Sequence, residues 1–451
     1  YTMLIQNISG VRGLVGTDLT PRKARRYAEA VHSLQPNGVI IVGRDSRPSG
    51  DEIVMGIVDK LIQLGRDVID CGIVPTPTIQ FLVGKTDSAG GIIVTASHNP
   101  IEWNGLKFVR EDGIFLYPKE CEELFSFVDD HLKKEPSQAN GMYWKDKNSI
   151  QKHIIHTVSL NCININRIRR RKFKVVIDAV NGAGAVALPA MLEALGCDVV
   201  PLNCEPSGEF TRGTEPLPEN LTDLCQSVIT NSADVGFAVD PDADRLAVVS
   251  EKGVPLGEEY TLVLAGEGYM KKMGTSETFV VNLSTSMALE KTAEKYKCKV
   301  ERTPVGEINV VEKMIELKAK FGGEGNGGVI LKEAHLGRDS LVGVTMVLNR
   351  MAQSKKPLSE IYSALPQFKI VKDKINLGDM DVESVLKNVR EKYSDVETND
   401  KDGLKFTWDD RWVHLRKSNT EPILRIYAEA PKISEAQNLV ESVKSTLQHK
   451  Q

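Results

Sequence analysis

A single serine stands in a short polar loop at the end of an apolar segment, where its hydroxyl could carry out chemistry. Residues 92–95 have high β propensity, Ala96 is small enough for a turn, and Pro100 prevents a helix from beginning inside the loop. We therefore expect a strand whose following loop displays Ser97, held out rather than buried, with His98 beside it. Because neighbours in sequence need not face each other, the Ser-His pair alone is more typical of a structural loop than of a nucleophile.

Three carboxylates alternate in a second loop far downstream. Asp240, Asp242 and Asp244 lie between apolar segments at 235–239 and 246–249, which predict strands. Carboxylates so close together repel one another unless a cation neutralises them. Mg2+ is a hard ion that takes oxygen ligands and keeps waters or substrate phosphate oxygens in its remaining positions. The sequence thus predicts a magnesium site on this loop.

Two other interpretations of this loop are a calcium EF-hand and a solvated acidic turn without a metal. The three aspartates fit EF-hand positions one, three and five, and Glu251 falls at position twelve. Position six, where the sharp turn needs glycine, is Arg245, and the flanking segments predict strands instead of helices. These features oppose the EF-hand, while the metal-free turn stays open.

A third segment, near the C-terminus, combines several kinds of phosphate ligand. Two arginines offer forked guanidinium donors, two hydroxyls can donate, and a Ser-Asn-Thr turn can point successive backbone amides at one anion. The residues are Arg416, Ser418, Asn419, Thr420 and Arg425. A charged hairpin loop without a ligand is the alternative.

A fourth segment is rich in glycine. Residues 322–328 contain five glycines and precede a predicted strand at 329–331. Glycines let a ligand approach the backbone closely, and Glu324 and Asn326 could hydrogen-bond its hydroxyl groups. A flexible connector is the alternative for this segment taken alone.

Together, in this order and at these separations, the four loops resemble those of the α-D-phosphohexomutase family. The resemblance spans nearly the whole chain and includes two further segments near the N-terminus. The matching motifs are SGVRG (9–13), GRDSRPS (43–49), TASHNP (95–100), DPDADR (240–245), GEGNGG (323–328) and RKSNTEP (416–422).

The resemblance implies a magnesium-dependent mutase that interconverts hexose 6-phosphate and hexose 1-phosphate. Ser97 would be a phosphoserine, with a hexose 1,6-bisphosphate as intermediate and activator. The implied metal ligands are Ser97, Asp240, Asp242 and Asp244, and the implied residues around the phosphate are Arg12, His98, Lys107 and Arg245. Lys107 is our first candidate for the general acid/base, with its pKa lowered if it is enclosed; an electrostatic clamp is the alternative.

The same resemblance implies how the substrate binds. Glu324 and Asn326 would read sugar hydroxyls, and Thr303 and Gly306 belong to a loop that lines the cleft. The non-reacting phosphate would be clamped by Arg416, Ser418, Asn419, Thr420 and Arg425.

The chain departs from the family pattern at three positions. Gly328 stands where many bacterial members carry a histidine, Asn419 replaces a common glycine, and Ser9 replaces a common aspartate. The GEGNGG and SNTEP forms resemble an archaeal-like branch in which substrate preferences are hard to separate. We expect phosphoglucosamine mutase activity first, with phosphomannomutase/phosphoglucomutase activity as the alternative.

Two rivals come from other function classes. A sugar-phosphate sensor on the same scaffold would be expected to lose Ser97 or one of the aspartates, and none is lost. A phosphatase using the acidic loop would need the aspartyl-phosphate form DxDx[TV], which this loop lacks, and it would leave the Ser97 loop unexplained.

Length and pattern predict the fold class. The chain has 451 residues, too many for one core, and strand and helix patterns alternate through most of the first 370 residues. We expect three related mixed-sheet α/β domains and a C-terminal α+β domain around a central cleft. The expected domains are 1–141 with the phosphoserine loop, 155–255 with the metal loop, 256–366 with the sugar-binding loop and 367–451 with the phosphate-binding loop.

Composition limits the expected partners. Lys and Arg number 57 against 61 Asp and Glu, for a net charge of -4, and the basic cluster at 167–174 reads as a solvated linker end, so we expect no nucleic acid. Seven scattered cysteines without a CxxC pair predict reduced thiols. The sequence shows no long apolar run, so we expect a cytoplasmic protein without a membrane partner. It would act on a small hexose phosphate, as a monomer or homodimer.

Overall fold

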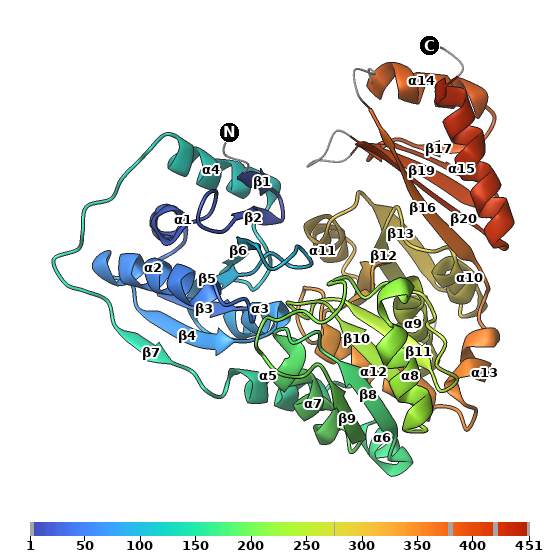
Figure 1. Ribbon diagram of the computed structural model, residues 1–451, viewed down its shortest axis with the longest axis horizontal. Coiled ribbons are helices and arrows are strands. Elements are labelled where there is room, and N and C mark those ends of the chain that lie inside the picture. The colour runs from blue at the N-terminus through green and yellow to red at the C-terminus, as the bar shows by residue number, and fades with distance from the viewer. Residues whose placement is uncertain (1–3, 275, 378–381, 418–422, 449–451) are drawn as a thin grey trace.

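The computed structural model describes residues 4–274, 276–377, 382–417 and 423–448, which fold into four consecutive domains (Figure 1). Each of the first three is an α/β unit built on a mixed sheet, and the fourth is an α+β unit. The predicted fold class is confirmed.

Domain I contains a seven-stranded sheet of order β1-β2-β6-β5-β3-β4-β7, in which β5, β3, β4 and β7 run parallel. Thr20 caps its first helix through a bond from the backbone N–H of Lys23, as the Thr-Pro signal predicts. Its strands are β1 (Ile5–Asn7), β2 (Gly10–Leu14), β3 (Val39–Arg44), β4 (Val68–Ile73), β5 (Ser88–Val94), β6 (Trp103–Arg110) and β7 (Tyr143–Lys145), and its helices are α1 (Pro21–Leu34), α2 (Gly50–Gln63), α3 (Thr76–Lys85) and α4 (Pro118–Asp129).

The sheet of domain I extends past residue 141, where we expected the domain to end. The polar stretch after α4 crosses to the far edge of the sheet, and β7 pairs there with β4. A three-residue strand supplies too little local pattern to be recognised from sequence.

Domain II holds a four-stranded sheet of order β11-β10-β8-β9, in which β11 is antiparallel to β10 and the other pairs are parallel. Two helices, α5 (Ser149–Val158) and α6 (Ile165–Arg171), connect it to domain I. Its elements are β8 (Lys174–Asp178), α7 (Gly184–Ala194), β9 (Asp198–Leu202), the 3-10 turn Pro218–Asn220, α8 (Thr222–Thr230), β10 (Val235–Val239) and β11 (Leu246–Ser250).

Domain III repeats this plan with the order β13-β12-β14-β15, in which β15 is the antiparallel strand. Its elements are α9 (Glu259–Met273), β12 (Thr278–Asn282), α10 (Ala288–Lys295), β13 (Lys299–Thr303), α11 (Glu307–Glu316), β14 (Phe321–Glu324), β15 (Gly328–Leu331), α12 (Ser340–Ala352) and α13 (Leu358–Ser363). Buried residues of domains II and III form one continuous hydrophobic cluster. The two domains therefore share a core and should move as one body.

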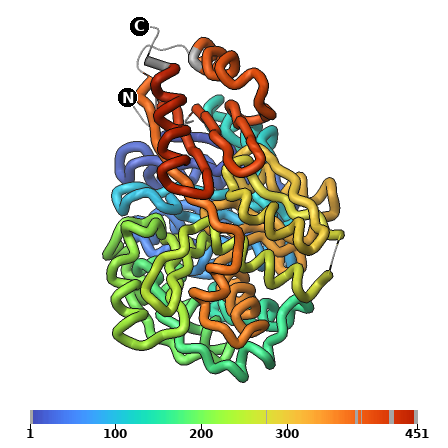
Figure 2. Tube along the Cα trace, turned by 90° about the vertical axis from the view of Figure 1, so that its right-hand side faces the viewer, coloured from blue at the N-terminus to red at the C-terminus, as the bar shows by residue number. Residues whose placement is uncertain are grey.

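Domain IV is an antiparallel sheet of order β16-β20-β19-β18-β17 with two helices, and it stands above the third domain at one end of the molecule (Figure 2). Two of its strands form a hairpin that turns around Asp409. Its elements are β16 (Lys369–Asn376), α14 (Val382–Lys392), β17 (Glu397–Asn399), β18 (Leu404–Thr407), β19 (Trp412–Lys417), β20 (Ile423–Ala430) and α15 (Ile433–Gln448).

Buried polar contacts join domain IV to domain III. Lys405 Nζ donates to Leu283 O at 2.7 Å, and the backbone N–H of Met287 donates to Glu429 Oε1 at 2.8 Å. The ring of His414 is bonded on both sides, by Nδ1 to Ser284 Oγ at 2.9 Å and by Nε2 to Asp402 O at 2.7 Å.

His414 makes this junction sensitive to acid. Burial lowers its pKa from 6.5 to about 4. Because the unfolded chain binds the proton more readily, the stability supplied by neutral His414 is complete above pH 6.5 and is lost as pH falls toward 4. We expect His414→Gln, which does not titrate, to reduce the loss of unfolding free energy between pH 7 and pH 4.5, by up to about 3 kcal/mol. Urea unfolding of both proteins across this range tests it, and parallel pH profiles would contradict it.

Candidate active site

Side chains from all four domains line one cavity of about 600 Å3. This is the central cleft that the sequence predicts. Among its lining residues are Arg12, Ser97, His98 and Lys107 of domain I, Arg245 of domain II, Gly306, Glu307, Glu324, Asn326 and Arg338 of domain III, and Arg416 and Arg425 of domain IV.

Ser97 lies at the wall of this cavity, but it is 2% exposed, so the expectation that the loop holds it out from the protein is wrong. The chain turns sharply after β5, with Ser97 at φ 52°, in the left-handed region. Its N–H donates to Thr95 Oγ1 at 2.9 Å, and its carbonyl accepts from Arg47 Nη2 at 2.9 Å. Thr214 of domain II donates to the carbonyl of His98, so a neighbouring domain contacts the loop, and Ser97 lines the cavity.

A buried ion pair fixes the backbone of this loop. Arg47 pairs with Asp45, and Thr95 Oγ1 donates to Asp45 Oδ2 at 2.6 Å. Burial raises the pKa of Asp45, although Arg47 opposes the shift. In the sequence these residues are visible only as parts of matching segments, because their supporting role depends on a contact across 50 residues of chain.

The three aspartates of the metal loop are buried, and their ligand oxygens lie within 4.8 Å of one another. One oxygen of each is bonded: Asp240 Oδ1 accepts from two backbone N–H groups at 3.2 Å, and Asp242 Oδ2 accepts from Thr76 and Lys107, both at 2.7 Å. The other oxygen of each has no hydrogen-bond partner among the described residues: Asp240 Oδ2, Asp242 Oδ1 and Asp244 Oδ1.

Three unpartnered buried oxygens fit a divalent cation. Leaving such atoms unpaired is costly, and oxygen is the ligand that Mg2+ prefers. Burial, together with the neighbouring Asp244 and Asp242, raises the pKa of Asp240 well above its usual value. The loop can therefore hold a metal ion, and a solvated acidic turn does not describe it.

Lys107 differs from our expectation. It is enclosed, and burial alone would lower its pKa, but Asp242 and Asp244 lie 2.7 and 3.4 Å from Nζ and raise it above its usual value. The expectation of a lowered pKa is wrong because the sequence does not show that both carboxylates lie against the ammonium group.

Two arginines and a histidine line the cavity together with Ser97. Arg12 Nη1 donates to Asn99 Oδ1 at 2.8 Å, and Arg245 Nε lies 4.0 Å from Asp240 Oδ2. His98 Nδ1 is 3.4 Å from Ser97 Oγ, and burial, with Arg245 and Arg12, lowers its pKa to about 2. His98 is thus neutral near pH 7, so the positive charge here comes from the arginines and Lys107.

The glycine-rich segment is a tight β14–β15 hairpin and not a flexible connector. Glu324 Oε1 accepts from Asn282 Nδ2 and from the backbone N–H of Gly306, both at 2.9 Å. Glu324, Asn326 and Gly306 line the cavity, whereas the hydroxyl of Thr303 donates to Pro304 O at 2.9 Å.

Domain IV contributes two arginines at the other end of the cavity. Arg416 Nε donates to Asp402 Oδ2 at 2.7 Å, and that oxygen also accepts from the backbone N–H of Val305 at 3.0 Å. Arg425 lines the cavity beside it. The predicted ligands Ser418, Asn419 and Thr420 lie outside the described residues.

Sequence reasoning missed one central residue, Arg338. It precedes α12, and its guanidinium is ion-paired with Asp244, Glu307 and Glu324 at 2.8, 2.9 and 3.1 Å. None of the recognised motifs contains it. An arginine before a helix carries no local signal of such contacts.

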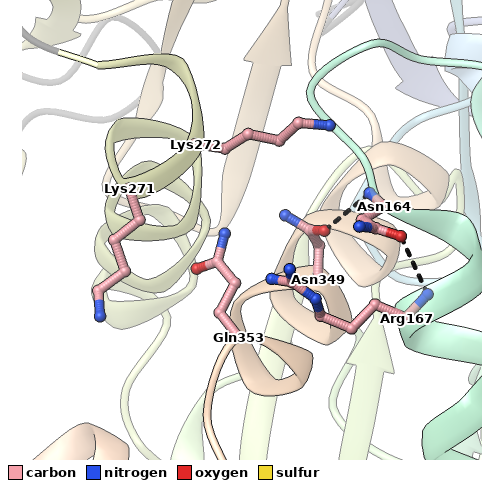
Figure 3. A pocket seen from close by; sticks show the side chains of 6 residues that line it. All are labelled: Asn164, Arg167, Lys271, Lys272, Asn349 and Gln353. Atoms are coloured by element: carbon pink, nitrogen blue, oxygen red, sulfur yellow. Dashed lines mark hydrogen bonds between the residues drawn. The ribbon is translucent and has the colours of Figure 1, made fainter.

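Two features lie outside this site. Asp339 Oδ2 accepts from His153 and His335, both at 2.8 Å, and Oδ1 caps α12. A second cavity of about 460 Å3 between α6, α9 and α12 is lined by basic and amide side chains (Figure 3), namely Asn164, Arg167, Lys271, Lys272, Asn349 and Gln353. Residues 165–171 form α6, so the predicted linker end is a helix.

Four family models match the chain in series: the three phosphoglucomutase/phosphomannomutase alpha/beta/alpha domains, I over residues 3–135, II over 151–253 and III over 257–368, and the C-terminal domain over 370–445. The chain belongs to the α-D-phosphohexomutase family. The resemblance seen in the four loops is thereby confirmed, and so is the prediction of an isomerase.

Similar proteins carry several mutase names. A probable phosphoglucosamine mutase of Methanopyrus kandleri is 33% identical, covering 96% of this chain and 95% of the relative. A phosphoglucomutase/phosphomannomutase of Thermococcus kodakarensis is 35% identical, with 96% of each covered. A phosphoglucosamine/phosphogalactosamine mutase of Sulfurisphaera tokodaii is 32% identical, with 98% of each covered.

Solved structures share the fold. A phosphoglucomutase/phosphomannomutase family protein of Burkholderia thailandensis matches with a TM-score of 0.87 and 25% identity, covering 100% of this chain and 98% of that one. No described helix is long and apolar enough to span a membrane.

Proposed function

We propose that this protein is a magnesium-dependent phosphoglucosamine mutase, which interconverts glucosamine 6-phosphate and glucosamine 1-phosphate through a phosphoserine at Ser97. The observation that carries the proposal is the arrangement within one cavity. Ser97 lines the cavity with Arg12, Lys107 and Arg245, and Arg416 and Arg425 line it from domain IV. Lys107 is ion-paired with Asp242 and Asp244 of the metal loop, whose three carboxylates each have one unpartnered oxygen among the described residues.

Phosphoryl transfer requires mainly positioning and charge neutralisation. Asp240, Asp242 and Asp244 would hold Mg2+, which when bound supplies Lewis-acid stabilisation of the charge on the transferring group. Arg12 and Arg245 would neutralise the phosphoryl oxygens. Arg416 and Arg425 would hold the non-reacting phosphate, so that binding energy far from the reaction orients the sugar.

Lys107 is the proposed proton carrier. The bond between phosphorus and Ser97 Oγ breaks while a bond to the sugar hydroxyl forms, and Oγ regains a proton as the hydroxyl loses one. The raised pKa of Lys107 keeps it protonated, so it would give its proton to Oγ and then take up the proton that the sugar hydroxyl releases; the reverse reaction would use the same two transfers in the opposite direction. A hexose 1,6-bisphosphate would load Ser97 and serve as the intermediate.

The second candidate is a phosphomannomutase/phosphoglucomutase. The Thermococcus kodakarensis relative with that name is 35% identical, against 33% for the probable phosphoglucosamine mutase. The two activities differ in the group at C2 of the sugar. A single hydrogen bond to that group can decide the preference.

A substrate panel distinguishes the two activities. We expect the highest kcat/KM, with Mg2+ and the matching 1,6-bisphosphate, on glucosamine 6-phosphate, and at least about tenfold less on mannose 6-phosphate and glucose 1-phosphate. Equal or faster turnover of the neutral sugars would favour the second candidate. Absence of turnover on all three would contradict the mutase proposal for these substrates.

A further inference from the structure

The missing side chain of Gly328 makes room for Arg338. A Cβ atom built at Gly328 would lie 2.2 Å from Arg338 Cδ and 2.8 Å from Arg338 Cγ, far inside van der Waals contact. The backbone of Gly328 is not in the left-handed region, so space, and not conformation, excludes a side chain there. The position where many family members carry a histidine is therefore filled here from the segment before α12.

The guanidinium of Arg338 contacts two parts of the active site at once. It reaches Asp244 of the metal loop in domain II and Glu324 of the sugar-binding hairpin in domain III. Glu307, at the first turn of α11, forms its third ion pair and accepts from Gln80 of domain I at 3.1 Å. The rigid fork of an arginine can fix several carboxylates in one geometry, which a lysine cannot do.

We propose that Arg338 is a positioning residue that couples the metal loop to the sugar-binding carboxylate, in the space that Gly328 leaves open. This inference rests on the proposed function. Arg338 holds Asp244 and Glu324 in a fixed relation, so the sugar hydroxyls and the phosphoryl group are aligned together. The positive charge of Arg338 also has two opposite effects on binding. It weakens the attraction of the metal loop for a cation, and it strengthens the attraction of the cavity for an anionic sugar phosphate.

The first test compares the two effects of the charge, on cation binding and on sugar-phosphate binding, which should have opposite signs. Arg338→Met keeps most of the volume and removes the charge. We expect Mn2+, used alone as the probe, to bind about tenfold more tightly by calorimetry, while KM for the hexose phosphate rises about tenfold. General loosening of the site would weaken both. Arg350→Met is the matched control, since Arg350 is a buried arginine of α12 paired with Glu267, away from the cavity, and should change neither constant.

The second test concerns the space beside Gly328 that Arg338 occupies. Gly328→Ala should displace Arg338 and reproduce the effects of Arg338→Ala on kcat/KM and on Mn2+ affinity. In the variant that carries both Gly328→Ala and Arg338→Ala, the added methyl group meets no arginine. Only Asn326 Oδ1, 3.1 Å from the built Cβ atom, must then shift slightly, so Gly328→Ala should lower kcat/KM less than about twofold in this background. Arg338→Lys, which keeps the charge without the fork, should keep Mn2+ affinity near wild type and lower kcat.

The outcomes separate this inference from the proposed function. Wild-type protein that binds no Mn2+ and turns over no hexose phosphate would contradict the proposed function. If the wild type does both, two results would overturn the coupling role alone. One is Arg338→Met protein that binds Mn2+ no more tightly than the wild type, and the other is additivity of the effects of Gly328→Ala and Arg338→Ala.

Discussion

Replacing Ser97 by alanine is expected to lower mutase kcat by at least about 10³-fold while leaving the fold intact. The hydroxyl is the atom that would carry the phosphoryl group, and no neighbouring hydroxyl on the loop can replace it, because Thr95 Oγ1 is bonded to Asp45. Among the residues that the structure describes, the polar contact of Ser97 Oγ is with His98 Nδ1 at 3.4 Å, beyond good hydrogen-bond distance. Its removal should therefore change the free energy of unfolding by less than about 1 kcal/mol.

Two measurements check the role of Ser97. Initial mutase rates give the loss of kcat, and incubation with a labelled hexose 1,6-bisphosphate should leave label on the wild-type protein but not on Ser97→Ala. Ser88→Ala is the matched control, because Ser88 is a buried serine at the start of β5, the strand that leads into the Ser97 loop. Retention of activity and label by Ser97→Ala would disprove the phosphoserine.

Local signals predicted the elements that carry the site. The apolar segments at 235–239 and 246–249 form β10 and β11, and the strand before Ser97 is β5, because strands buried on both faces have nearly continuous apolar sequences. The elements that were missed have weak local patterns. Helix α6 begins at an Asn164 cap, but its basic run resembles an exposed linker.

The motifs named most of the side chains that the structure brings to the cavity, but not Arg338, and they did not show how these side chains contact one another. Each motif fixes which side chains one loop presents. Arg338 meets Asp244 across 94 residues of chain, and Lys107 meets Asp242 across 135, so only the folded domains bring them together. The raised pKa of Lys107 and the burial of Ser97 both follow from such long-range contacts.

The metal loop should be strained when it holds no ion, and Asp240→Asn tests this. Burial and its two neighbouring carboxylates raise the pKa of Asp240, so the folded state holds the proton more tightly than the unfolded chain. The stability linked to this group is present below pH 3.8 and is lost as pH rises through the raised pKa. Near pH 7, well above the ordinary pKa of an aspartate, this group therefore makes the metal-free protein less stable than it is in acid, and a neutral amide of the same shape should relieve the repulsion.

We expect Asp240→Asn to raise the Tm of the metal-free protein by a few degrees, about 2 to 5 °C, while lowering kcat with Mg2+ by at least about 10²-fold. Added Mg2+ should raise the Tm of the wild type and have little effect on the variant, since one ligand charge is gone. Asp178→Asn is the matched control: Asp178 is also buried at the end of a domain II strand, but it is paired with Arg212 at 2.7 Å, so the same substitution should lower Tm. Changes in Tm of opposite sign for these two Asp→Asn substitutions would indicate that the metal loop needs a cation to neutralise its charge. A lower Tm for Asp240→Asn without metal would show instead that the three carboxylates stabilise the fold by themselves.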